Sequence, residues 1–154
     1  TNEAVNQALI EGAVGGIVAA DCKIGRMTYW AANATVPVYE ISFRIVMTNV
    51  SSKPVTLSGD NFATTLDGTP IPPFNFSARD VGDADIWRTY DSLTIRPGEE
   101  RSVALAYEIS QSTYDSWYRS SRTVAVSFTC GNQRVTYTKN SRSDEITVSD
   151  IETL

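Results

Sequence analysis

Histidine is absent from the chain. Its absence excludes the Ser-His-Asp and Cys-His arrangements of nucleophilic catalysis and the usual zinc sites. The only cysteines, Cys22 and Cys130, are too far apart in sequence for a Cys-x-x-Cys redox motif. Paired carboxylates would suit a glycosidase, but nothing in the order of the acidic residues singles out a pair. We therefore expect a protein without enzymatic activity.

Long apolar runs are also missing. The most apolar window, residues 8–22, is interrupted by Glu11, Asp21 and three glycines. It is shorter than the ~20 apolar residues that a membrane-spanning helix requires. No basic segment followed by an unbroken apolar stretch marks a signal peptide. The sequence therefore predicts a protein that does not span a membrane.

Positive charge is sparse and scattered along the chain. Thirteen Lys and Arg residues face eighteen Asp and Glu residues, which gives a net charge of -5 and a sequence pI of about 4.7. Binding to nucleic acid depends on clustered basic side chains that neutralise phosphates. We therefore expect no nucleic-acid partner.

The cysteines and the asparagines bear on the location of the protein. An even cysteine count allows a Cys22–Cys130 disulfide, with two buried free thiols as the alternative. Asn33, Asn49 and Asn75 each stand in the Asn-x-Ser/Thr pattern of glycosylation. Because disulfides persist in oxidising compartments, these features favour an extracellular, cell-surface glycoprotein.

Alternation of apolar and polar residues is the clearest pattern in the chain. Residues 38–49 predict a half-buried strand, with these apolar residues on one side: Tyr39, Ile41, Phe43, Ile45 and Met47. Two alternating runs flank Gly131-Asn132 and predict a type II′ hairpin, whereas residues 75–91 read as a long loop. Short strands with frequent turn signals predict an all-β, antiparallel, immunoglobulin-like β-sandwich of about seven to nine strands, with a barrel as the competing fold.

The N-terminal residues stand apart from this pattern. We expect residues 1–16 to form an arm, as a short helix or a donor strand, and residues 17–154 to form the sandwich. A glycine-rich apolar segment suits β-strand addition, in which main-chain hydrogen bonds give the affinity. The alternative is an ordinary first strand with a frayed end. The apolar residues that we expect to bind a partner here are Val5, Leu9, Ile10, Val14 and Ile17.

Two stretches resemble a known family. The runs "ISFRIVMTNVSSKPVTLS" and "SLTIRPGEERSVALAYEI" are similar to telokin-like immunoglobulin-fold domains of bacterial and archaeal surface proteins. Their shared pattern is a strand ending in Thr-Asn, a polar pair, Lys-Pro-Val-x-Leu and a later Pro-Gly-Glu. The likeness covers about residues 38–130 and implies the fold and a surface location. The architecture is more weakly similar to archaeal surface-filament subunits.

Asp80, Asp83 and Asp85 lie close together in the "RDVGDAD" stretch, with a glycine among them. Carboxylate oxygens in a flexible loop are the ligands that Ca²⁺ prefers. We weigh a weak calcium site against an ordinary solvated acidic loop, and we expect no other cofactor.

Large aromatic residues fall in two of the expected loops, 75–91 and 110–122. Trp87 and Tyr90 lie in the first, and Trp117 and Tyr118 in the second. Such side chains either bind a sugar or a protein or close the open ends of the core.

The sequence favours a structural role. We expect a subunit of a cell-surface filament or surface layer that associates with itself through its arm and sheet edges. The alternative is a monomeric adhesion or anchoring module that binds a glycan, an envelope component or a protein through its loops.

Overall fold

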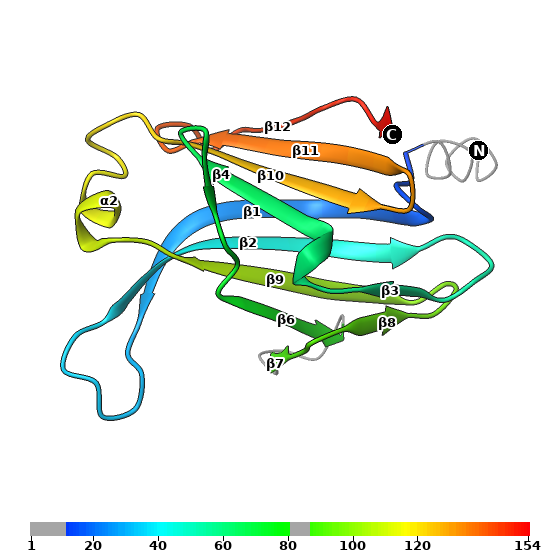
Figure 1. Cartoon of the computed structure of the whole chain (residues 1–154), viewed down its shortest axis with the longest axis horizontal. Coiled ribbons are helices and arrows are strands. Elements are labelled where there is room, and N and C mark those ends of the chain that lie inside the picture. The colour runs from blue at the N-terminus through cyan, green and yellow to red at the C-terminus, as the bar shows by residue number, and fades with distance from the viewer. Residues whose placement is uncertain (1–11, 81–86) are drawn as a thin grey trace.

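The computed structural model of the protein describes residues 12–80 and 87–154. Within these ranges the chain forms β-strands, one short helix, α2 (Gln111–Asp115), and one 3-10 turn, η1 (Gly59–Asn61) (Figure 1). The strands are, in chain order, β1 (Ile17–Tyr29), β2 (Val38–Asn49), β3 (Val55–Leu57), β4 (Phe62–Leu66), β5 (Thr69–Ile71), β6 (Asn75–Asp80), β7 (Arg88–Thr89), β8 (Leu93–Ile95), β9 (Glu100–Glu108), β10 (Thr123–Cys130), β11 (Gln133–Asn140), β12 (Ile146–Val148) and β13 (Glu152–Thr153).

The strands form two packed antiparallel sheets, which confirms the predicted β-sandwich. The first sheet has the order β1-β2-β9-β6-β7, and the second has the order β12-β11-β10-β4-β5, with β13 also paired to β11. Strands β3 and β8 make a separate small pair. The described residues hold thirteen strands, more than the sequence predicted, because several are edge pieces of two or three residues.

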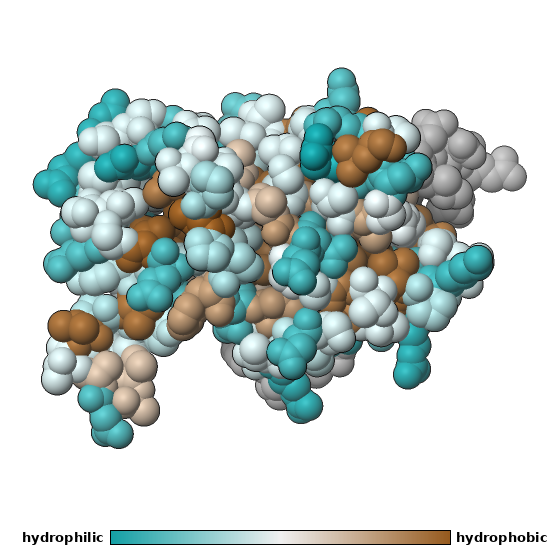
Figure 2. Space-filling model, in the orientation of Figure 1, coloured by the Kyte–Doolittle hydropathy of each residue, from teal (hydrophilic) through white to brown (hydrophobic). Residues whose placement is uncertain are grey.

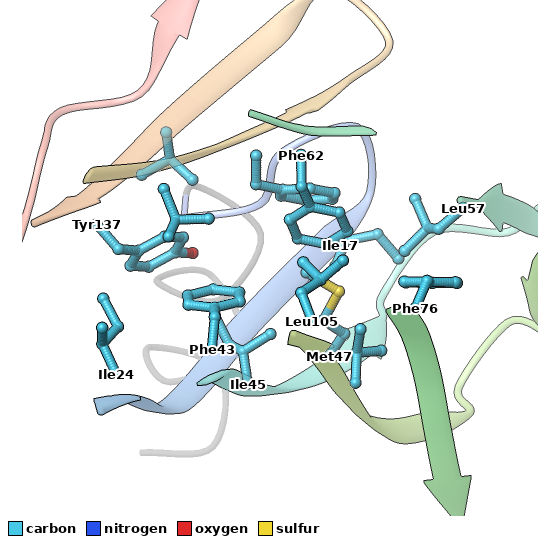
Figure 3. Packing of buried hydrophobic residues seen from close by; sticks show 14 of the residues in the cluster. Ile17, Ile24, Phe43, Ile45, Met47, Leu57, Phe62, Phe76, Leu105 and Tyr137 are labelled. Atoms are coloured by element: carbon cyan, nitrogen blue, oxygen red, sulfur yellow. The ribbon is translucent and has the colours of Figure 1, made fainter. Parts of the chain in front are cut away.

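The core lies between the two sheets. Figure 3 shows Phe43 and Ile45 from the first sheet directed toward Phe62 and Tyr137 from the second. The ring of Phe43 lies 6.1 Å from that of Phe62 and 5.8 Å from that of Tyr137, within the range of favourable aromatic pairs. The apolar side of β2 that the sequence predicted is therefore the side that builds the core.

Turn chemistry follows the sequence closely. The β10–β11 hairpin pairs Cys130 with Gln133, and Gly131 has the positive φ of 61° that a first central residue of a type II′ turn needs. Helix α2 begins after Ser110, whose hydroxyl accepts a hydrogen bond from the Thr113 backbone N–H.

The prediction of a loop over residues 75–91 was wrong in its first third. Strand β6 pairs with β9 on one side and β7 on the other, and Phe76 and Ala78 point into the core. Two prolines before this segment hid the strand from the sequence pattern. They lie outside it, at Pro72 and Pro73, so the ladder of β6 is intact.

The connection between β1 and β2 projects from the sandwich at the lower left of Figure 1. Trp30 and Val36 in this connection are 63% and 68% exposed, and the projection carries brown, pale and teal residues side by side in Figure 2. In the described ranges, no helix has the length and apolar composition needed to cross a bilayer.

Candidate functional site

The face of the first sheet that points away from the core is hollowed along its middle. Ser42 of β2 stands opposite Ala106 of β9, and Ala104 stands opposite Ser77 of β6. These four outward side chains are small. Because alanine is depleted in strands, two alanines at successive outward positions of β9 mark a place where bulk is missing. The middle of the sheet is therefore a shallow floor.

Larger side chains stand around this floor. The hollow has a volume of about 320 Å³ and is bordered by Met27 and Tyr29 of β1 and by Phe74 and Trp87. Phe74 is half exposed. We call this hollow the outer groove. Its size lies at the low end of the ~300–1,000 Å³ of ligand sites, and its apolar borders around a few polar groups are typical of them.

Two arginines hold Trp87 at one end of the outer groove. The guanidinium carbon of Arg44 lies 5.4 Å from the Trp87 ring centre, and that of Arg79 lies 4.9 Å from it. Both distances fall within the cation–π range of about 6 Å. A second hollow of about 290 Å³ continues beyond Trp87 and also borders Lys23. This end of the outer groove is therefore basic.

The opposite end of the outer groove is acidic. Glu40 of β2 is only 3% exposed, although it lines the groove, and it stands directly across from Glu108 of β9. Within the described part of the chain, the Glu40 carboxylate has no hydrogen-bond or ion-pair partner. Burial, and then the charge of Glu108, raise its pKa above the ordinary value. Burial and the same two carboxylates also raise the pKa of Tyr29.

The predicted disulfide was wrong, because Cys22 and Cys130 are both free thiols. Cys22 lies in the first sheet, in the irregular step of β1 between Ala20 and Lys23. Cys130 ends β10 in the second sheet, where its Sγ lies 3.8 Å from the carbonyl oxygen of Gly15. At ~3.3 Å per strand residue, Cys22 is roughly 16 Å beyond the start of β1, too far for a disulfide. Burial raises the pKa of Cys22 to about 12.

The three predicted glycosylation sites differ in access. Asn33 is exposed at the β1–β2 connection, with a φ of 63°. Asn75 is half-buried in β6, where it lines the outer groove. Asn49 is fully buried, and its side-chain amide donates to the carbonyl oxygens of Lys53 and Ile95 at 2.8 Å. The prediction of a glycan at Asn49 was therefore wrong, because the nitrogen that would carry it is enclosed.

The loop aromatics do not form one surface. Trp117 is fully buried and lies 5.7 Å from the Lys139 ammonium group, so it closes an end of the core and the prediction that it binds a partner was wrong. Tyr118 is 58% exposed and lies over the Arg26 guanidinium. Tyr90 packs against the core, and its hydroxyl accepts a hydrogen bond from Arg101. Trp87 alone of the four borders the outer groove.

The remaining predicted residues lie at the ends of the described ranges. Val14 and Ile17 are 3% and 1% exposed within their own core, so they do not present side chains to another molecule. Three of the residues proposed for partner binding lie outside the described residues: Val5, Leu9 and Ile10. Asp83 and Asp85 lie outside them too, and Asp80 belongs to β6. No group of three metal-binding side chains is found in residues 12–80 and 87–154. The calcium site stays a prediction.

Sequence reasoning missed most of the outer groove. Glu40, Ser42 and Arg44 alternate with the apolar residues of β2, and the sequence pattern assigned them no role. The available signal was the pair of alanines in β9, at positions where a strand usually carries larger residues. One sequence does not show that these positions stand beside Ser42 and Ser77.

No protein-family model matches the chain, and no curated protein matches it. Three solved structures are similar in fold. The yjhA protein from Bacillus subtilis is 12% identical, with 75% of this chain and 74% of that chain covered and a TM-score of 0.46. An uncharacterized β-sandwich protein from Clostridium difficile 630 is 14% identical, with 79% and 83% covered and a TM-score of 0.48. A protein from Archaeoglobus fulgidus is 13% identical, with 87% and 98% covered and a TM-score of 0.37. At these identities the likeness concerns the fold alone.

Proposed function

We propose that the protein is a non-catalytic binding module of the cell surface that holds an oligosaccharide in the outer groove. The observation that carries this proposal is the groove itself, with a floor of small side chains between aromatic borders and a buried, unpartnered Glu40 at one end. This is the adhesion alternative drawn from the sequence, moved from the loops to the face of a sheet.

The chemistry of the outer groove matches that of a sugar. A sugar ring has apolar C–H faces and a rim of hydroxyl groups. Trp87, Tyr29 and Phe74 offer flat apolar surfaces to the faces. The Glu40 carboxylate and the Arg44 guanidinium offer charged hydrogen-bonding groups to the rim. Tyr29, Glu40 and Arg44 are held in place by the paired strands β1 and β2, which reduces the entropy lost on binding.

A peptide strand suits the outer groove less well. Strand addition requires unpaired backbone groups at a sheet edge. The floor strands β2 and β9 are each paired on both sides, so their backbone groups are engaged. Recognition on this face depends on side chains alone.

The absence of cleavage is part of this proposal, and the carboxylates of the outer groove support it. Glycosidases place two carboxyl groups on opposite sides of the bond that they cleave. Glu40 is the one carboxylate among the described residues that line the outer groove, which supports binding rather than cleavage.

The cell-surface location is supported by the resemblance to telokin-like surface domains and by the exposed sequon at Asn33. With the disulfide absent and Asn49 buried, these are the arguments that remain. Self-assembly into a filament through residues 1–16 stays a prediction.

Trp87→Ala tests the proposal. A panel of neutral and amino-sugar oligosaccharides identifies a ligand, and titration calorimetry then measures its Kd. We expect Trp87→Ala to weaken binding by up to about tenfold, since one aromatic contact contributes up to about 1.5 kcal/mol. The matched control is Trp30→Ala, which removes an exposed tryptophan outside the outer groove.

Other results would contradict the proposal. Binding that is lost in Trp30→Ala and kept in Trp87→Ala would place the ligand on the projecting loop. If no member of the panel bound, the proposal that the ligand is an oligosaccharide would be wrong. Chromatography of the bound oligosaccharide after long incubation should show it uncut, and shorter products would mean that the protein is an enzyme.

A further inference from the structure

The hollow of about 290 Å³ beyond Trp87 is a separate feature of the outer face of the first sheet. Arg44 and Trp87 border both this hollow and the outer groove, so the two spaces are continuous around these side chains. Three of the residues that line the hollow are positively charged: Lys23, Arg44 and Arg79. We call this space the basic hollow.

Strand pairing brings the three cations of the basic hollow together. Lys23 of β1 stands directly opposite Arg44 of β2. Arg79 lies on β6, beyond β9, and the β9 residue opposite Arg79 is the small Ser102, which also lines the hollow. Both arginines lie within cation–π distance of the Trp87 ring. The long basic side chains therefore surround a space that has a small residue at its floor.

The positive charge of the basic hollow is not balanced. In the described part of the chain, Lys23, Arg44 and Arg79 form no ion pair with an acidic side chain. Asp21 also lines the hollow, but it is paired with none of the three. Like charges directly opposite on neighbouring strands are destabilising. Because the protein has a net charge of -5, its overall composition does not account for a cluster of cations here.

Arg79 has hydrogen-bonding capacity that no described residue uses. Its Nε atom is buried and has no acceptor among the described residues, and a buried donor without an acceptor costs stability. The planar guanidinium groups of Arg44 and Arg79 match the geometry of a carboxylate and bind it through short, charge-assisted hydrogen bonds. The chemistry of the basic hollow therefore favours a carboxylate over a neutral hydroxyl group.

We propose that the ligand of the outer groove is an oligosaccharide containing uronic acid, with one carboxylate in the basic hollow. This inference rests on the oligosaccharide binding proposed above and names the class of sugar. Glu40 lies at the opposite end of the outer groove and repels a carboxylate, whereas the basic hollow attracts it. The charges therefore determine the direction in which the ligand lies along the sheet.

Matched neutral and acidic sugars test the class of ligand. The probes are tetrasaccharides of glucose and glucuronic acid, of mannose and mannuronic acid, and of galactose and galacturonic acid. Within each pair the linkage is the same, and only the group at C6 differs. In titration calorimetry with the full chain at low salt, we expect at least one acidic member to bind about tenfold or more tightly than its neutral partner. Salt at about 0.5 M should reduce this difference by screening the charges.

Lys23→Gln separates the basic hollow from the outer groove. Lys23 lines the basic hollow but not the outer groove, and its side chain is exposed, so the fold should tolerate the change. We expect binding of the acidic tetrasaccharide to weaken about threefold or more and binding of its neutral partner to stay unchanged. Lys53→Gln is the matched control, because it makes the same change at an exposed lysine outside both spaces.

The two proposals can fail separately. Equal Kd values within every pair, or equal losses for both members of a pair in Lys23→Gln, would overturn the uronic acid and leave the oligosaccharide site in place. If none of the six tetrasaccharides bound, the oligosaccharide would be wrong, and this inference with it. A Kd for inorganic phosphate that Lys23→Gln raises and Lys53→Gln does not would then assign the basic hollow to a free anion.

Discussion

The two faces of strand β2 differ in what determines their residues. On the inner face, Phe43, Ile45 and Met47 are at most 1% exposed and fill the space between the sheets. On the outer face, Ser42 and Arg44 lie on or beside the outer groove. Consecutive residues of this strand therefore alternate between packing in the core and lining the outer groove.

This difference separates stability from recognition. The inner face is fixed by volume, since protein cores tolerate little change in size. The outer face of the sheet contains features that do not help the fold, namely the two alanines of neighbouring β9 and the buried Glu40 carboxylate across from Glu108. Features that oppose local rules concentrate at functional sites. The contrast predicts that substitutions on the inner face lower the free energy of unfolding, whereas substitutions on the outer face leave it nearly unchanged.

Phe43→Ala should have the largest effect on the free energy of unfolding. It removes a fully buried ring between Phe62 and Tyr137 and should destabilise the protein by about 3–5 kcal/mol. Urea denaturation followed by far-UV circular dichroism measures the change. Ser42→Ala, one residue away on the outer face, is the control and should stay within about 0.5 kcal/mol. Comparable losses of unfolding free energy at both positions would show that the two faces do not differ in their contribution to stability.

Asn49→Ala should have the second-largest effect and lower the free energy of unfolding by about 2–3 kcal/mol. The side chain of Asn49 ends the inner face of β2 and links the turn at residues 51–53 to Ile95 of β8. It donates to the carbonyl oxygens of Lys53 and Ile95 and accepts from the Ser51 backbone N–H. Its removal leaves these groups without partners in a buried site. The same urea titration measures the loss.

Thr48→Ala provides the comparison for Asn49. Thr48 is an outward-facing neighbour on the same strand, and its substitution should remove less than about 1 kcal/mol. If Asn49→Ala were as mild as Thr48→Ala, the buried amide network would not be what holds this turn.

The fold could be predicted further than the site. Period-2 alternation located β2 from Val38 to Asn49, and Gly131-Asn132 located the hairpin after β10. Both signals are local in sequence, so a single chain contains them. The strand β6 was missed because its apolar pair, Phe76 and Ala78, is short and follows prolines. Its identity depends on pairing with β9, which is distant in sequence.

The site depends on contacts that no local pattern contains. Trp87 was singled out from the sequence, but its two arginine neighbours come from β2 and β6. Glu40 faces Glu108 only because β2 and β9 pair in one particular register. The disulfide and the Asn49 glycan failed for a similar reason, since cysteine count and sequon matching carry no information on distance or burial.

Glu40→Gln should have the smallest effect on stability, and it should stabilise the protein rather than destabilise it. Relief of the like charge across from Glu108 and of the buried charge should raise the Tm at pH 7 by about 1–3 °C. Glu108→Gln is the control; it relieves only the repulsion, because Glu108 is exposed, and should raise the Tm by less. A fall in the Tm of Glu40→Gln would show that the carboxylate has a stabilising partner.

The pH dependence follows from the raised pKa of Glu40. Below the pKa of an unfolded glutamate, Glu40 is protonated in both the folded and the unfolded protein, so its charge costs no stability. As the pH rises through the higher folded pKa, the folded protein must ionise a buried group, and stability is lost. The gain from Glu40→Gln should therefore be larger at pH 7 than at pH 4, as scanning calorimetry at both values would measure. Such a gain would support the ligand proposed for the outer groove, because a carboxylate that costs stability in the free protein is suited to a hydrogen bond with a bound hydroxyl group.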